Sequence, residues 1–237
     1  CRQLMNALRE QVSFEVLTTT RDSNLPPRCQ IDDVHVVRFQ WKQGTWNYCG
    51  AILKFAVFFL HRIKYFQIVH LHGFSLKSAL LVVLSRIFHK KVIIKMTSPG
   101  HDDPIAMRQR GLLLNHFFSL GDAYVGVSPL FGKLYRESKL PSYRLKQIPN
   151  GVDTDRFHPV TTGEKATLRD QLGLPKGMKL ILFVGHFSRE KYPDILLKAW
   201  KQSVAETLSD TGLIFVGSTY PYHYEVDAEL VRDIRHL

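Results

Sequence analysis

Long apolar runs are missing from this chain of 237 residues. Its most apolar stretches, residues 51–60 and 79–84, reach about half of the roughly 20 residues that a bilayer-spanning helix needs, or less. The sequence therefore predicts no membrane-spanning helix. With 45% hydrophobic and 22% charged residues, the composition is ordinary for a globular protein with one large or two small domains and a substantial core.

Cysteine is scarce as well. Cys1, Cys29 and Cys49 show no CxxC spacing, and an odd number suits the reduced thiols of the cytosol better than a disulfide framework. We therefore expect a cytoplasmic protein. The chain begins at Cys1, inside an amphipathic helical pattern, so we treat it as a fragment whose start, including any targeting signal, is missing.

Acidic residues are few in the first part of the chain. Residues 1–150 contain 21 Lys and Arg against 9 Asp and Glu, a balance of +12, whereas residues 151–237 contain 11 against 12, a balance of −1; together they give the net +11. A basic half predicts an anionic partner such as a membrane surface, a phosphate-bearing lipid or nucleic acid. Nucleic acid has the least support, because no helix-turn-helix, zinc or aromatic RNA-binding signature accompanies the charge.

Nucleotide and metal motifs are incomplete. There is no GxGxxG, which argues against an NAD enzyme. Gly126 to Lys133 is similar to a P-loop, but five residues separate its glycines instead of four and Leu134 replaces Ser or Thr, so the phosphate and Mg²⁺ geometry fails. His70 and His72 point to the same face of a predicted strand, yet no third ligand accompanies them, and we expect no metal site.

Predicted strands alternate with predicted helices along the first part of the chain. The strands are expected at 14–20, 34–39, 67–73, 92–97, 123–128 and 145–148, and the helices at 1–11, 51–66, 75–89, 107–120 and 129–140. We expect Ser75 to cap the third helix, and we expect a polar loop at 21–33 and a turn-rich segment at 44–50. Such alternation is typical of a parallel sheet covered by helices on both faces.

The stretch Lys146 to Pro159 interrupts this pattern. Pro149 removes a backbone donor and Asn150-Gly151 tolerates positive φ, so the strand stops and the chain leaves its sheet. Beyond it the pattern restarts, with helices expected at 164–172, 194–208 and 226–237 and strands at 180–184 and 213–216. The sequence thus predicts an α/β protein with domains 1–150 and 151–237, the second cut off after two strands.

Two segments, Ile148-Pro-Asn-Gly-Val-Asp153 and Val184-Gly-His-Phe-Ser-Arg-Glu-Lys191, carry a family resemblance. They resemble the "IPNGVD" segment and the "VG(R)xSxxK" loop of the family-4 retaining glycosyltransferases, the glycosyl transferases group 1 type with the GT-B fold. The resemblance is weak before residue 120 and strong over 122–217. It implies two Rossmann-like, doubly wound parallel-sheet domains, with the ligand crevice at the carboxyl ends of the strands. It also implies transfer of a sugar from a UDP- or GDP-linked donor to an acceptor hydroxyl, without a metal or other cofactor.

The loop after Gly185 is the expected donor site. A strand-loop-helix junction offers backbone N–H groups and a positive helix end to a phosphate, and Lys191 or Arg189 adds a full charge. In the family an arginine stands at the position of His186 and a glycine at that of Tyr192, so one cationic contact stays open, with Arg189 as a replacement. The residues implied for donor binding are Gly185, His186, Ser188, Arg189, Lys191 and Gly217, with Lys191 stabilising the leaving group.

The acceptor side is expected at the strand ends of the first domain. Families of this type often place a histidine where this chain has Thr97, and His101 follows in the next loop. His101 would orient hydroxyl groups, with an adjacent carboxylate fixing its tautomer; alternatively, Asp102 and Asp103 cap the next helix and His101 is merely exposed. We take His101, with Lys191, as the catalytic candidates. The residues expected to line the acceptor side are His72, Gly73, Thr97 and Asn150.

One more motif is set aside, and two interpretations stay open. Asp153-Thr-Asp155 matches the DxD metal signature of GT-A enzymes, but it follows the Asn-Gly turn rather than a GT-A strand, so we set it aside. Helix 51–66, with its phenylalanines and with Lys54, Arg62 and Lys64, is either a core helix with a basic edge or a face that touches the inner side of a membrane.

Whether the chain is catalytically active is the second open interpretation. The family's E-x7-E motif should lie beyond Leu237, so the chain is either an enzyme fragment acting on glycan or lipid-linked precursors, inactive alone, or a GT-B module that only binds. A nucleotide-sugar epimerase on the same fold would need acid/base carboxylates that the sequence does not place.

Overall fold

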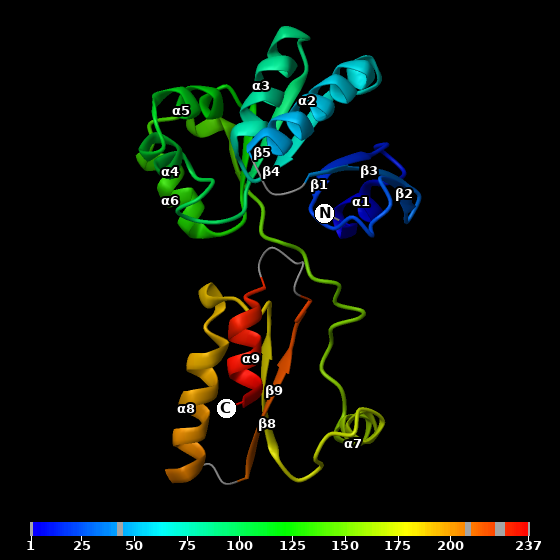
Figure 1. Ribbon diagram of the computed structural model, residues 1–237, viewed down its shortest axis with the longest axis vertical. Helices are drawn as coiled ribbons and strands as arrows, with labels where there is room; N and C mark the ends of the chain where they lie inside the picture. The colour runs from blue at the N-terminus through cyan, green and yellow to red at the C-terminus, as the bar shows by residue number, and fades with distance from the viewer. Residues whose placement is uncertain (1, 42–44, 207–209, 221–225, 237) are drawn as a thin grey trace. The chain divides into compact units, whose positions relative to one another are not determined.

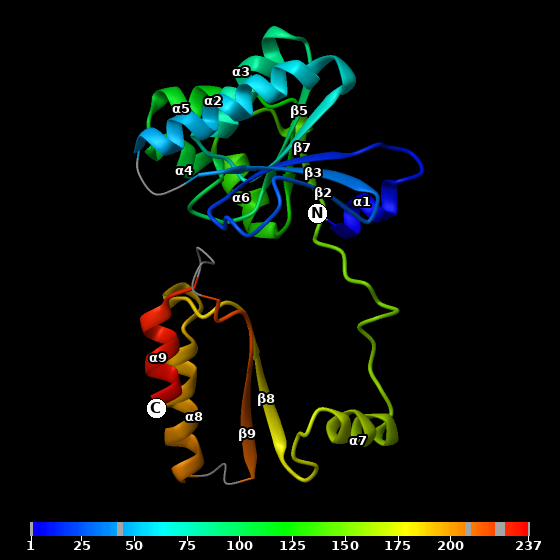
Figure 2. The ribbon, with the colours of Figure 1, turned by 45° about the vertical axis from the view of Figure 1, so that its right-hand side comes forward.

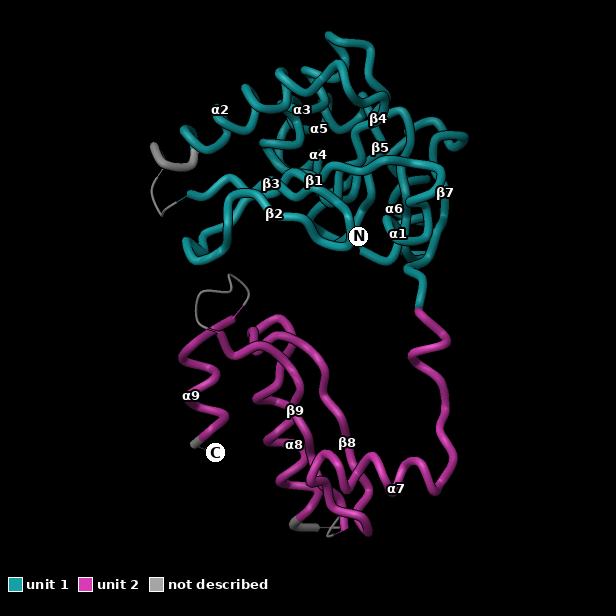
Figure 3. Tube along the Cα trace, turned by 90° about the vertical axis from the view of Figure 1, so that its right-hand side faces the viewer, with its two compact units in different colours: residues 1–152 teal, residues 153–237 magenta. Residues whose placement is uncertain are grey.

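The computed structural model describes residues 2–41, 45–206, 210–220 and 226–236, and divides into two compact units, 1–152 and 153–237 (Figure 3). The division falls two residues after the boundary expected at Asn150-Gly151. Within the described ranges, no helix is both long enough and apolar enough to cross a membrane.

Unit 1 alternates strands and helices as the sequence predicts, apart from one additional strand, β2. Its elements are α1 (Arg2–Leu8), β1 (Glu15–Thr20), β2 (Arg28–Ile31), β3 (Val34–Gln40), α2 (Thr45–Arg62), η1 (Ile63–Tyr65), β4 (Ile68–His72), α3 (Leu76–Ile87), β5 (Lys91–Met96), α4 (Pro104–Gln109), α5 (Leu112–Ser119), β6 (Ala123–Gly126), α6 (Pro129–Glu137), η2 (Ser142–Arg144) and β7 (Leu145–Gln147). Ser75 precedes α3 in the extended conformation of an N-cap, although its side chain makes no capping hydrogen bond.

A parallel sheet in the order β4-β5-β6-β7 is the centre of unit 1 (Figure 1). Because crossovers between parallel strands are right-handed, strands added in chain order place their crossover helices on one face. Alternate strand residues such as Ile94 and Met96, which have no exposed surface, pack there with buried residues of α3, α4, α5 and α6. The opposite face is more open and carries His70, His72 and Lys95, none of which is buried.

The remaining strands of unit 1 form a separate sheet in the order β1-β3-β2. β1 and β3 are parallel, whereas β2 pairs antiparallel with β3. The two strands of this hairpin are joined by Asp32 and Asp33, whose φ values of 47° and 65° match the tight hairpin turns that short polar residues tolerate. The expectation of a loop throughout 21–33 was therefore wrong.

Two helix boundaries also differ from expectation. The helix expected at 51–66 already begins at Thr45, within the segment expected to be turn-rich. The continuous helix expected at 107–120 is broken into α4 and α5, because Gly111 adopts φ 120°, a backbone conformation that a residue with a Cβ atom rarely takes.

Unit 2 contains α7 (Thr162–Gln171), β8 (Lys179–Val184), η3 (Arg189–Lys191), α8 (Pro193–Glu206), β9 (Thr211–Val216) and α9 (Ala228–His236). Thr161 and Glu164 form a capping box at the start of α7, which satisfies backbone donors of its first turn. β8 and β9 pair in parallel, and α8 and α9 pack side by side against them (Figure 2). The loops after the two strands therefore meet at the same edge of the sheet.

Candidate active site

The carboxyl ends of β8 and β9 come together at two glycines. Gly185 N donates a hydrogen bond of 3.0 Å to Val216 O, which prolongs the strand pairing. A Cβ atom on Gly217 would lie only 1.8 Å from Gly185 O, so the two backbones approach more closely than a side chain permits. The expected donor residues Gly185 and Gly217 thus form one backbone platform at the strand ends, where the close approach of the two backbones requires a glycine at 217.

The loop that follows Gly185 is held in place by the packing of Phe187 and by a hydrogen bond with Asp227, just before α9. Phe187 is buried and packs against Phe183 and Phe215, with ring centroids 6.4 and 5.8 Å away. Its carbonyl oxygen accepts a 2.9 Å hydrogen bond from Asp227 N, and the Asp227 side chain caps α9 through Leu230 N at 3.0 Å. These contacts fix the loop on α9 and leave its outer side to solvent.

Arg189 has its charge compensated within the protein. Its Nε donates to Asp227 Oδ2 at 2.9 Å, and its Nη2 lies 3.7 Å from Glu229 Oε2. The hydrogen bond from Leu230 N, followed by that from Arg189, lowers the pKa of the Asp227 carboxyl, while the carboxylate raises the pKa of Arg189. Arg189 is therefore a poor substitute for the family's missing arginine, because a phosphate would compete with these two carboxylates.

Lys191 differs from Arg189 in this respect. It is exposed, and among the described residues no carboxylate pairs with it. A Cβ atom on Gly185 would lie 3.9 Å from Lys191 Cγ, so the stem of the lysine lies against the glycine platform. Its ammonium group is the cation that this loop can offer to an anionic ligand.

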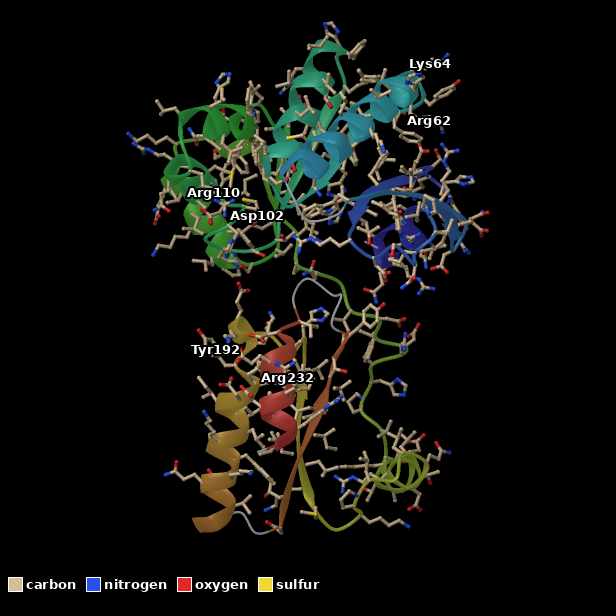
Figure 4. The ribbon with its side chains drawn as sticks, viewed as in Figure 1. Arg62, Lys64, Asp102, Arg110, Tyr192 and Arg232 are labelled. Carbon is tan, nitrogen blue, oxygen red and sulfur yellow. The ribbon has the colours of Figure 1, made fainter. Side chains whose placement is uncertain are left out.

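Tyr192 closes the loop in the left-handed region, with φ 52° (labelled in Figure 4). Glycine adopts this conformation without the steric cost that a Cβ atom brings, which explains why a glycine is typical at this position. His186, half buried at the start of the loop, and Ser188, whose N–H bonds His186 O at 2.9 Å, complete the expected donor residues.

A buried carboxylate organises the strand ends of unit 1. Asp102, labelled in Figure 4, is 4% exposed. It accepts hydrogen bonds from Thr97 N at 2.8 Å, Thr97 Oγ1 at 2.6 Å and Ser98 N at 2.8 Å. A Cβ atom on Gly73 would lie 3.2 Å from Asp102 Oδ2, so Asp102 draws Thr97 and Gly73 together.

His101 does not share this cluster's hydrogen bonds. Asp103 accepts from Gly100, Ile105 and Ala106 N–H groups and caps α4, and Asp102 is engaged as described. His101 is exposed, with its Nδ1 3.4 Å from Arg110 Nη2. The idea that a neighbouring carboxylate fixes its tautomer was wrong, because both carboxylates bind the backbone; a catalytic role for His101 stays a prediction.

Lys95 is a polar residue of this region that the sequence reasoning missed. It pairs in register with His72, and its Nζ donates to Asn150 Oδ1 at 2.8 Å. The rings of His70 and His72 lie 4.6 Å apart on the same face. The lysine in an otherwise apolar strand was the available signal. His72, Lys95 and Asn150 therefore form one polar surface beside Gly73.

This histidine pair predicts a pH dependence of stability. Partial loss of solvent lowers the pKa of His70, and partial loss of solvent followed by the charge of His70 lowers the pKa of His72 to about 4. In the unfolded chain both rings titrate near 6.5, so between about pH 6.5 and 4 the unfolded state binds more protons, and stability is lost as pH falls. Because solvent reaches part of His72, we expect a loss of only about 1–2 kcal/mol.

The measurement is urea unfolding of unit 1 at pH 7.5 and 4.5, compared with a variant carrying His70→Gln and His72→Gln. Carboxylates titrate in both proteins, so the difference between them isolates the histidines. An equal loss of stability in both would contradict the expectation.

Comparison with known proteins places these two units in a family. Residues 1–151 match the family described as "Glycosyl transferase 4-like domain", and residues 164–233 match "Glycosyl transferases group 1". The chain belongs to this glycosyltransferase family. The match to the second description includes the loop from Gly185 to Lys191 and the platform residue Gly217 of this glycosyltransferase chain.

Curated relatives resemble parts of the glycosyltransferase chain. Spore coat protein SA of Bacillus subtilis is 37% identical over 106 residues, which cover 42% of this chain and 26% of that protein. D-inositol 3-phosphate glycosyltransferase 2 of Catenulispora acidiphila is 40% identical over 62 residues, 26% of this chain and 14% of that protein. The chain thus matches between about one seventh and one quarter of the length of these relatives.

Among solved structures, the Anabaena protein HepE in complex with UDP-glucose superimposes with a TM-score of 0.59. The superposition covers 94% of this chain and 64% of HepE at 14% identity. This likeness shows the fold: two Rossmann-like α/β units with parallel strands.

Within the described ranges, no group of three His, Cys, Asp or Glu residues is placed to hold a metal ion.

Proposed function

We propose that this chain forms part of a glycosyltransferase that transfers a sugar, with retention of configuration, from a nucleoside diphosphate sugar to an acceptor hydroxyl. The diphosphate binds the loop Gly185–Lys191. UDP is the preferred nucleotide of the proposal, because HepE, whose fold the chain shares, is described in complex with UDP-glucose.

The observation that carries the proposal is the uncompensated Lys191 beside the glycine platform. Backbone N–H groups after Gly185 and the start of α8 favour an anion at this point, and Lys191 supplies a full positive charge. As the bond between sugar and diphosphate breaks, negative charge grows on the leaving phosphate. A fixed ammonium stabilises that charge more than it stabilises the bound donor, which lowers the barrier.

The acceptor side is proposed on unit 1, at His72, Gly73, Thr97 and Asn150. His72 keeps its ring neutral at pH 7, since its pKa lies near 4, so it can accept a hydrogen bond from a hydroxyl group. A glycan or lipid-linked precursor is the proposed acceptor, and a cytoplasmic enzyme at the inner face of a membrane is the proposed setting, in line with the basic first half of the chain.

Replacing Lys191 by alanine should weaken UDP binding by about 1.5–3 kcal/mol, roughly 10- to 150-fold, because a charge-assisted contact is lost. Isothermal titration with UDP and GDP measures the effect. It is carried out on this chain and on a version extended at its C-terminus. The matched control is Lys201→Ala, which replaces an exposed lysine about two turns after the start of α8 and should leave the affinity unchanged.

Arg189→Ala tests whether Lys191, rather than Arg189, is the cation that binds the diphosphate. Its guanidinium is bound to Asp227 and Glu229, so its loss should change UDP affinity far less than the loss of Lys191. Equal affinity of Lys191→Ala and the unchanged protein, or no binding of either nucleotide, would contradict the proposal. Both family descriptions name transferases, so they favour this reading over a nucleotide-sugar epimerase.

A further inference from the structure

Unit 1 contains an open groove between α2 and the β2-β3 hairpin, with a volume of about 580 Å³. Phe39 of β3 and Leu53, Val57 and Phe58 of α2 form its apolar walls. The Phe39 ring is fixed between Phe55 and Phe58, with centroids 4.9 and 5.7 Å away. The Phe39 wall of the groove is therefore already packed in the absence of a ligand.

The outer wall of the groove is uncovered. Leu53 is 65% exposed and Val57 46% exposed, so two large apolar side chains of one helix face solvent beside a hollow. Single exposed apolar residues are common, but these two border an apolar groove, so the exposed apolar surface is concentrated at one place.

The rim of the groove carries positive charge alone. Arg28, Lys54 and His61 line it, and none of its lining residues is acidic. Lys54 and His61 are seven residues apart, so they lie on one side of α2, about 10 Å apart, with Val57 between them. Among the described residues, no carboxylate pairs with Arg28 or Lys54; Arg28 instead lies over the Phe58 ring, 5.8 Å from its centroid.

The charge around the groove extends well beyond it. From residue 34 to residue 101 the chain has 68 residues without a single Asp or Glu and with ten Lys or Arg. This stretch includes α2 and α3, which pack against each other in unit 1 (Figure 1). Arg62 ends α2 and Lys64 follows it in η1 (Figure 4). Arg62 binds Glu15 at 3.2 Å, whereas no carboxylate of the described ranges pairs with Lys64. An apolar hollow within a cationic surface is complementary to an amphiphile with an anionic head group.

We propose that this surface docks on an anionic phospholipid bilayer, with one acyl chain entering the groove and the head-group phosphate bound by Arg28, Lys54 and His61. The inference deepens the membrane partner named above and rests on it. A protein partner would need acidic side chains flanking an apolar helix, and nothing on this surface selects such a helix over a lipid. The lipid matches both features, since its phosphate and its chain are covalently joined.

Flotation with vesicles tests the proposal. The chain should bind vesicles containing about a third phosphatidylglycerol and should not bind phosphatidylcholine alone. Lys54→Glu reverses a rim charge, and Val57→Asp places a charge where the acyl chain would lie; each should weaken binding by about tenfold or more. Lys133→Glu on α6 and Leu113→Asp on α5, both exposed and outside the groove, are the matched controls and should bind within about twofold of the unchanged chain.

The outcomes separate the possibilities. Equal weakening by Lys54→Glu and Lys133→Glu would show adsorption by net charge and would overturn the groove; absence of binding to anionic vesicles would overturn it as well. If Val57→Asp fails to fold by circular dichroism, the more conservative Leu53→Ser replaces it. UDP titration of the same variants should show unchanged affinity, because the groove lies outside the donor loop. If the unchanged chain binds UDP but not anionic vesicles, the groove alone is refuted; if it binds anionic vesicles but not UDP, the donor site alone is refuted.

Discussion

Replacement of Gly217 by alanine should destabilise unit 2 by about 3 kcal/mol or more. The new Cβ atom would lie 1.8 Å from Gly185 O, which is a backbone atom that no side-chain rotation can move away. The two strand ends must separate, and the 3.0 Å hydrogen bond from Gly185 N to Val216 O is then lost. Because these atoms support the proposed donor loop, nucleotide binding should fall together with stability.

Urea unfolding of unit 2 measures the effect of Gly217→Ala. The matched control is Gly177→Ala in the same unit, where a Cβ atom meets nothing within 4 Å and φ is not positive. That substitution should change stability by less than about 0.5 kcal/mol. Similar values for both variants would mean that the strand ends are further apart than the structure places them.

The second large effect is expected at Asp102. Replacement by alanine removes the acceptor of Thr97 N, Thr97 Oγ1 and Ser98 N at a site that is 4% exposed. Three hydrogen bonds to a charged acceptor are lost, although water reaches part of the exposed Thr97 and Ser98 and compensates some of that loss, so we expect unit 1 to lose about 2–3 kcal/mol. The loop would also release Thr97, so binding of the proposed acceptor should weaken.

Asp102→Asn sharpens this test, because it preserves shape but turns one acceptor oxygen into a donor that faces other donors. It should cost about 1.5–3 kcal/mol. Glu10→Ala, an exposed carboxylate of the same unit, is the control and should be nearly neutral. If Asp102→Asn were as neutral as Glu10→Ala, the carboxylate would not be the anchor of these strand ends.

Local signals made much of the fold predictable. The apolar strands with alternating helices are detectable in single segments, and Pro149 with Asn150-Gly151 marks the end of the first unit within two residues. β2 was missed because Arg28-Cys29-Gln30-Ile31 is short and mostly polar, and because its hairpin turn is Asp32-Asp33 rather than a pair containing glycine. The break at Gly111 was missed because leucine-rich sequence continues after it.

The candidate site was predictable only in outline. The proposed donor loop consists of consecutive residues, so sequence reasoning could name Gly185 and Lys191 as candidates, and their role stays a prediction. The ion pair of Arg189 with Asp227 joins residues 38 positions apart, and no local sequence pattern predicts it. In the same way, the contact of Lys95 with Asn150 spans 55 positions and depends on how two strands pair. Long-range pairing, rather than propensity, decides which cation remains free for a phosphate.

The location of the nucleotide is the central claim. Amide resonances of the chain, followed by nuclear magnetic resonance while UDP is added, test it most directly. The account predicts that the largest shifts fall on Gly185 to Lys191 and on Gly217, and that Lys191→Ala reduces them at a given UDP concentration. Largest shifts in unit 1, or none in this loop at saturating UDP, would contradict the account.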